Sequence, residues 1–163
     1  MKHHILVSSC LLGHLVRYDQ REVPFTDPRF LRWQQEGRFI AICPEVTGGL
    51  PTPRPPAERQ GDRVINTEGA DVTCEFAKGA QAALQLAKDH QISIAILKQN
   101  SPSCGSLFIY DGSFTGKKVQ GEGLTAALLR QHGILVFGED QLDEVEQELT
   151  RLEQHHHEDL SPT

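Results

Sequence analysis

Residues 5–10 read ILVSSC, an apolar run that ends in a cysteine, and this stretch decides the fold. Two further runs end in the same way, FIAIC at residues 39–43 and, after a short loop, IAILKQNSPSC at residues 94–104. A run of β-favouring residues without polar alternation predicts a strand that is covered on both faces. In an open parallel sheet the carboxyl ends of such strands meet at one edge, where ligands bind. We therefore expect the three cysteines, Cys10, Cys43 and Cys104, to share one pocket.

The rest of the chain alternates between strand-like and helix-like patterns. Short apolar runs occur at residues 5–9, 39–43, 92–97 and 134–137. Helical apolar spacing occurs at residues 27–36, 71–90, 124–132 and 141–154. Every gap between the runs is long enough for a helical crossover, which favours an α/β fold. We predict a single Rossmann-like domain with a sheet of about four mainly parallel strands, helices on both faces and the site at the strand carboxyl ends.

The boundaries of this domain and two irregular stretches complete the prediction. The domain is expected to cover residues 1–154, followed by a frayed polar tail, HHHEDLSPT, at residues 155–163. Residues 44–61 hold five prolines and three glycines. They predict an ordered loop at the rim of the pocket, with a proline-rich docking ligand as the alternative. Residues 108–119, FIYDGSFTGKKV, predict a hairpin because DG lies between two β-like runs.

Composition narrows the class of protein. A chain of 163 residues with 38% hydrophobic and 23% charged residues is typical of one soluble globular domain. It has no apolar run long enough to cross a membrane and no signal peptide, so we expect a cytoplasmic protein. In that compartment a cysteine cluster is more often metal-binding or catalytic than disulfide-bonded. The net charge of −6 argues against DNA and other nucleic acids as general partners.

The cysteines are the strongest chemical signal in the chain. Thiolate sulfur selects iron–sulfur clusters, zinc or copper(I). The paired spacing of structural zinc sites and the C-x-x-C of thioredoxin-like proteins are both absent. Three single cysteines on three loops are compatible with a metal centre that keeps one position open, although free cysteines often only pack in the core. Cys74 falls in a helical stretch and is expected to be a bystander.

A carboxylate and a hydroxyl accompany these thiols. Glu45 lies on the loop that leaves the second strand, and Ser101 lies in the turn before the third cysteine. With a metal they would provide the base, the orienting group and the Lewis acid of metal-assisted hydrolysis. The alternatives are that Glu45 is a loop acid paired with Arg54 or Arg59, and that Ser101 caps the turn before Pro102.

Further polar residues and glycines near these loops are candidates for binding a substrate. Serines beside the thiols could orient it, glycines allow its close approach to the backbone, and arginines could meet a phosphate or carbonyl. These candidates are Ser8, Ser9, Arg17, Gly48, Gly49, Arg54 and Ser103. The segment Gly121-Glu122-Gly123 precedes a predicted helix whose free amides could hold an anion, or it is a plain turn.

Taken together, six segments resemble the thiouracil desulfidase (TudS-like) family, over about residues 5 to 138. They are VSSCLLG, RYD, CPEVTGGLPTPRPPAE, LKQNSPSCGS, IYDGSFTG and GEGLTAALL. The resemblance implies a [4Fe–4S] cluster held by three cysteines, with one iron free of protein ligands. At the matching positions the ligands would be Cys10, Cys43 and Cys104, and the catalytic pair would be Glu45 and Ser101.

The function that the resemblance implies is the removal of sulfur from a thiolated pyrimidine, such as 4-thiouracil, 2-thiouracil or 4-thio-UMP. The products would be the uracil compound and hydrosulfide, with the cluster as Lewis acid and sulfur acceptor. Glu45 would activate a water, and Ser101 would position the substrate or relay a proton. Some relatives carry an extra domain associated with thiolated tRNA, and its absence here favours a small substrate over tRNA. We expect a monomer or a homodimer.

Two other functions fit the same residues. One is a non-enzymatic iron–sulfur protein, either a sensor or a sulfur carrier. The other is a metal-free hydrolase in which Ser101 or a cysteine is the nucleophile, although the chain has no G-x-S-x-G motif.

Overall fold

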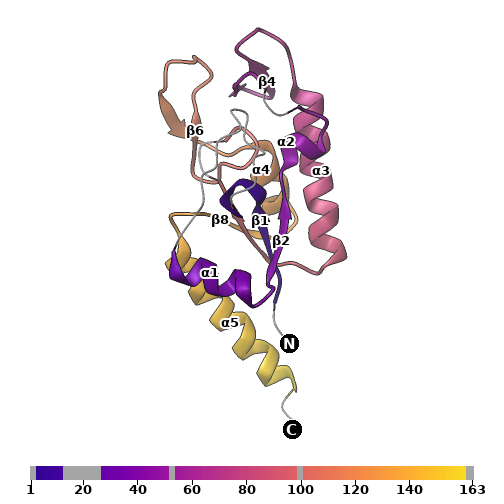
Figure 1. Cartoon of the computed structure of the whole chain (residues 1–163), viewed down its shortest axis with the longest axis vertical. Helices are drawn as coiled ribbons and strands as arrows, with labels where there is room; N and C mark the ends of the chain where they lie inside the picture. Colours follow the sequence, from indigo (N-terminus) through magenta and orange to yellow (C-terminus); the bar gives the residue numbers. More distant parts are fainter. Residues whose placement is uncertain (1–2, 13–26, 52–53, 99–100, 161–163) are drawn as a thin grey trace.

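The computed structural model describes residues 3–12, 27–51, 54–98 and 101–160, the last six of them by their backbone alone. Its main sheet has the number of strands and the parallel strand direction that the sequence predicts (Figure 1). Four strands, all parallel to their neighbours, lie in the order β2-β1-β5-β8. They are β1 (Ile5–Ser8), β2 (Phe39–Ile42), β5 (Ile94–Leu97) and β8 (Leu135–Gly138). The α/β fold with a parallel sheet is therefore confirmed.

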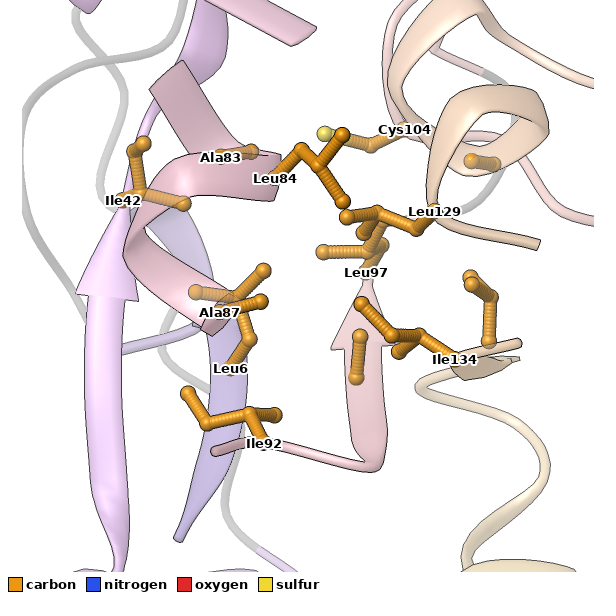
Figure 2. Close-up of a cluster of buried hydrophobic side chains, with 13 residues drawn as sticks. Leu6, Ile42, Ala83, Leu84, Ala87, Ile92, Leu97, Cys104, Leu129 and Ile134 are labelled. Carbon is orange, nitrogen blue, oxygen red and sulfur yellow. The ribbon is translucent and has the colours of Figure 1, made fainter. Parts of the chain in front are cut away.

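Helices cover both faces of this sheet, as the unbroken apolar strands predict. All four residues of β1 and of β5 are buried, and their side chains alternate between two clusters. On one face they meet α3 (Thr73–Asp89) and α4 (Leu124–Gln131). Figure 2 shows this cluster, in which Leu84 and Ala87 of α3 pack with Leu6 and Leu97 of the sheet. On the other face they meet α1 (Pro28–Gln35) and α5 (Leu142–Leu160).

The helix ends follow local chemistry. The Asp27 side chain accepts a hydrogen bond from the Arg29 amide and Pro28 opens α1, as the sequence predicts. The helix predicted from residue 71 is α3, which starts at Thr73, two residues later. The Asp71 carboxylate lies outside the helix and accepts a hydrogen bond from the Thr73 amide. The helix predicted to end at residue 154 is longer than expected, and the frayed tail from residue 155 stays a prediction. The last helix continues to residue 160, and no glycine or proline interrupts it.

The prediction of a loop over residues 44–61 is only partly right. A short helix, α2 (Pro44–Thr47), follows β2 directly. Further on, β3 (Ala57–Gln60) pairs antiparallel with β4 (Arg63–Asn66). Gly61, with φ of +65°, lies in the two-residue turn between these strands and adopts a backbone conformation that favours glycine.

The predicted hairpin at residues 108–119 is confirmed, with a longer connection than a tight DG turn. Its strands are β6 (Phe108–Tyr110) and β7 (Lys118–Gln120), paired antiparallel. Both hairpins lie beyond the carboxyl ends of the main sheet, at the top of Figure 1. We call β3–β4 and β6–β7, with their connections, the hairpin rim. Among the described residues, no helix has the length and apolar character needed to cross a membrane.

Candidate active site

A cavity of about 370 Å³ lies at the carboxyl edge of the main sheet. This volume is within the range of small-molecule sites. Residues that follow β1, β2 and β5 line one side of it, and residues of the hairpin rim line the other. Cys10, Cys43 and Cys104 all line this cavity, which confirms that the three thiols share one pocket. Cys74 lies exposed on α3 and does not line it.

Three different local structures hold these cysteines, and we call the segments that carry them the cysteine edge. Cys10 lies in a 3-10 turn, Ser9–Leu12, directly after β1. Cys43 is the residue between β2 and α2. Cys104 lies in the turn that precedes α4, is 5% exposed and belongs to the core cluster of Figure 2. Each thiol is therefore fixed to the packed body of the protein.

The surroundings of the thiols affect their ionisation. Burial raises the pKa of Cys104 far above its usual value, and the nearby Cys10, Glu45 and Cys43 raise it further. A hydrogen bond from the Ser8 side chain opposes this effect. Burial also raises the pKa of Cys43, against a hydrogen bond from the Val46 amide. A bound cationic centre would favour the thiolates, because a coordinating thiol loses its proton.

The donor set fits a cluster better than a single metal ion. No three histidine, cysteine or carboxylate side chains in the described part of the chain converge on a point that would hold one ion. In an iron–sulfur cluster each cysteine sulfur binds a different iron, so the ligands need not converge on one point. Three soft sulfur donors on one cavity wall meet this requirement.

Glu45 also lies at the cavity, and Arg54 holds it there. The Arg54 Nε atom lies 3.4 Å from Glu45 Oε1, and the Nη1 atom of the same side chain donates to the Pro51 carbonyl. The arginine side chain is 4% exposed and the glutamate side chain 21% exposed. Burial raises the pKa of Glu45, and the charge of Arg54 lowers it. Glu45 therefore lies at the cavity, as the candidate base should, and also pairs with Arg54, as the alternative predicted.

Ser101 combines the two roles that the sequence left open. Its Oγ atom accepts hydrogen bonds from the Ser103 amide at 3.0 Å and the Cys104 amide at 3.1 Å, so it caps the turn that carries the thiol. The residue also lines the cavity. Because Oγ accepts both bonds and no described residue accepts its hydrogen, that hydrogen is available to donate to a bound molecule.

The structure brings only some of the predicted substrate-binding residues to the cavity. Ser8, Ser9 and Arg54 line it. Ser103 does not, because it is fully buried and its hydroxyl pairs with Thr125 Oγ1 at 2.7 Å. Arg17 lies outside the described residues.

The predicted glycine contacts have another explanation. A Cβ atom on Gly48 would lie 1.9 Å from the Glu75 carbonyl of α3, so this glycine lets α2 pack closely on α3. Gly49 has φ of +108° just after α2, and neither residue lines the cavity. The anion site predicted before α4 is wrong. The first amides of that helix, at residues 124–126, donate to the carbonyls of Pro102 and Ser103.

Three cavity residues with polar side-chain atoms were missed by the sequence analysis: Glu58, Lys98 and Tyr110. Lys98 directly follows β5 and forms an ion pair with Glu139 at 3.0 Å. The other two belong to the hairpin rim. All three lie within the quoted segments PRPPAE, LKQNSPSC and IYDG, which is the signal that could have found them.

Comparisons with known proteins show which family and which solved fold the chain resembles. A family model described as 2-thiouracil desulfurase matches residues 5–141. The uncharacterized protein YbbK of Bacillus subtilis (strain 168) is 42% identical over 151 residues, which cover 86% of this chain and 99% of that protein. A solved structure named as the [4Fe-4S]-dependent thiouracil desulfidase TudS is 54% identical, with a TM-score of 0.90. The match covers 91% of this chain and 99% of that one.

Proposed function

This chain belongs to the 2-thiouracil desulfurase family, and from that membership we propose that it is a [4Fe–4S]-dependent enzyme that removes sulfur from a thiolated pyrimidine. The substrate is 4-thiouracil, 2-thiouracil or 4-thio-UMP, and the products are the uracil compound and hydrosulfide. The observation that carries the proposal is the meeting of three thiols and the Glu45 carboxylate at a single cavity.

Cys10, Cys43 and Cys104 would hold the cluster, since they are the cysteines that line the cavity. When bound by three cysteines, such a cluster supplies one iron without a protein ligand, a Lewis acid that polarises the thiocarbonyl group of the substrate. The hydrogen bond from Ser8 to Cys104 stabilises that ligand as a thiolate.

Glu45 is assigned as the general base. It takes a proton from a water molecule whose oxygen bonds to the ring carbon that carries sulfur. The carbon–sulfur bond then breaks, the oxygen passes its second proton to the sulfur and becomes the ring carbonyl, and the sulfur leaves as hydrosulfide. The carbon keeps its oxidation state, so no electron donor is required. Arg54 keeps the Glu45 carboxylate at the cavity.

Ser101 is assigned to positioning and proton relay, because its hydroxyl is fixed by two backbone amides and can donate to the ring or to the leaving sulfur. Tyr110 lines the cavity, and we assign its aromatic ring to stacking with the pyrimidine ring. A planar aromatic substrate therefore suits this cavity.

The test begins with iron and acid-labile sulfide per chain after anaerobic purification. The samples are the wild type, the three ligand variants Cys10→Ala, Cys43→Ala and Cys104→Ala, and the matched control Cys74→Ala. We expect about four irons and four sulfides in the wild type and in the control, as a [4Fe–4S] cluster requires, and loss in the three variants. Turnover of 4-thiouracil, followed by its thione absorbance and by released hydrosulfide, should follow the iron content.

Two results would contradict the proposal. Activity that survives complete removal of iron would identify a metal-free serine or cysteine hydrolase. A fully loaded protein that converts none of the three thiolated pyrimidines would identify an iron–sulfur sensor or sulfur carrier.

A further inference from the structure

Glu58 is a buried acid for which the desulfidase chemistry above has no use. It lies in β3, is 8% exposed and lines the cavity. Its Oε1 atom accepts hydrogen bonds from the Gly112 amide at 3.0 Å and the Phe114 amide at 3.2 Å. Both donors belong to the β6–β7 connection. Among the described residues no group donates to Oε2, so one oxygen is fixed by the backbone and the other is left for a ligand.

The backbone around Glu58 is held firmly. The Gln60 side chain, two residues further along β3, donates to the Gly112 carbonyl at 2.8 Å. Gly112 has φ of +94°, and a Cβ atom there would lie 2.9 Å from the Arg59 carbonyl. The β6–β7 connection therefore cannot move away from β3 without breaking several contacts, and the carboxylate keeps one position.

A carboxylate only accepts hydrogen bonds, so its natural partner in the cavity is an N–H group. Among the described residues that line the cavity, the acids are Glu45 and Glu58, and Glu45 is engaged with Arg54. Both 2-thiouracil and 4-thiouracil carry an N–H group at N3. This nitrogen lies between C2 and C4, so it is next to the thiocarbonyl carbon in either compound.

We propose that Glu58 is a substrate-binding residue that determines specificity, with Oε2 accepting the hydrogen bond of the pyrimidine N3–H. This rests on the proposed function, because it takes the pyrimidine as the substrate. The contact serves 2-thio and 4-thio compounds alike and rejects rings without a hydrogen at N3. It also distinguishes the two acids by role, since Glu45 moves a proton while Glu58 accepts a hydrogen bond and holds the ring.

The test compares Glu58→Gln with Gln60→Ala in the iron-loaded enzyme. Glutamine can keep Oε1 as the acceptor for both amides, while its NH₂ group replaces the free oxygen with a donor. Gln60→Ala removes a bond to the same Gly112 but does not alter the lining of the cavity. We would measure the dissociation constant for uracil by calorimetry, and kcat/KM for 4-thiouracil and for its N3-methyl derivative.

We expect Glu58→Gln to weaken uracil binding about 10- to 100-fold, the range for loss of a hydrogen bond to a charged group. Its iron content should be unchanged. The wild type should prefer 4-thiouracil to the N3-methyl compound by about 100-fold or more, because a site built for an N–H rejects a ligand without one. That preference should fall to a few-fold in Glu58→Gln and remain in Gln60→Ala.

Three results would overturn the proposal. Equal kcat/KM of the wild type for 4-thiouracil and its N3-methyl derivative would overturn it without any variant. If Glu58→Gln does not fold, Glu58→Asp is a second variant, and we expect it to show intermediate losses of uracil affinity and of preference for 4-thiouracil. Unchanged uracil affinity with unchanged preference in Glu58→Gln would also overturn it, as would the same losses in Gln60→Ala. Uracil binding that depends on Glu58 in a protein that desulfurises nothing would instead overturn the proposed function alone.

Discussion

Different interactions hold the two sides of the cavity, the cysteine edge and the hairpin rim, in place. The cysteine edge consists of segments that leave a buried parallel sheet, and Cys104 itself packs among core side chains. The hairpin rim consists of short antiparallel strands, and all three residues of β7 are exposed. Its attachments include polar contacts such as those of Gly112 with Glu58 and Gln60. The first side is fixed by packing, and the second depends on hydrogen bonds in addition to the buried side chains of Val64 and Ile109.

This difference suggests a division of labour. A metal cluster requires ligands that do not move, and packed strand ends provide them. Recognition of a small polar ring requires directional partners, and the hairpin rim provides Glu58 and Tyr110. Changes in the cysteine edge should therefore abolish chemistry, while changes in the hairpin rim should alter affinity.

The largest effect expected in a protein that keeps its cluster is that of Glu45→Gln. Replacing the base should lower kcat about 10²- to 10⁴-fold, because the amide cannot take a proton from water. Iron content should match the wild type, since the residue is not proposed as a ligand. Single-turnover kinetics with 4-thiouracil, run beside the exposed-site control Glu144→Gln, would measure the loss. Full activity of Glu45→Gln would exclude it as the base.

The next effect tests the packing of the cysteine edge. Gly79 of α3 faces α2, and a Cβ atom there would lie 1.9 Å from the Pro44 carbonyl. Gly79→Ala should push α2 away and displace Cys43, which lies directly before it. We expect a loss of about 1–3 kcal/mol in the free energy of unfolding, as for other overpacked sites, and reduced iron per chain.

The matched control is Gln81→Ala on an exposed position of the same helix, which should change neither quantity. Thermal unfolding and iron analysis of both variants would decide. If Gly79→Ala kept its full iron content, close packing of α2 on α3 would not be what positions Cys43.

The same difference explains how much the sequence could predict. The four main strands and their helices follow from unbroken apolar runs and helical spacing, so the fold and the meeting of three thiols were predicted correctly. The roles of these residues, the cytoplasmic location and the oligomeric state stay predictions. The β3–β4 hairpin was missed because the strand Ala57–Gln60 is mostly polar and so gives no apolar run. Glu58 is buried there because its carboxylate accepts hydrogen bonds from distant backbone amides, which no local pattern shows. Its one local signal was the Gly61-Asp62 turn, which the surrounding prolines obscured.

Short loops were the other limit. Ser101 and Ser103 lie two residues apart in one turn, yet the first lines the cavity and the second pairs with Thr125 in the interior. Gly48 was assigned to a ligand and instead meets a neighbouring helix. Composition marks such residues as candidates, but the direction of each depends on tertiary contacts that no local pattern contains.

On the hairpin rim, Tyr110→Ala should raise KM for 4-thiouracil about 10-fold, within the range measured for loss of a base stacked on an aromatic ring. Its kcat should change little, because the ring is not assigned to proton transfer. Tyr110→Phe keeps the aromatic face and should retain the wild-type KM. A large loss in the phenylalanine variant would instead assign the hydroxyl, and not the ring face, to the substrate.

The smallest effect expected is that of Gln60→Ala, and it separates the stability of the hairpin rim from the chemistry. The variant loses one hydrogen bond to the Gly112 carbonyl, which contributes about 1 kcal/mol. In a domain of this size that corresponds to a fall of about 2–4 °C in Tm. Iron content and kcat should stay at the wild-type level, because the cysteine edge does not depend on this bond. A loss of iron in Gln60→Ala would show that the two sides of the cavity are coupled, and the division between packing and hydrogen bonding would then fail.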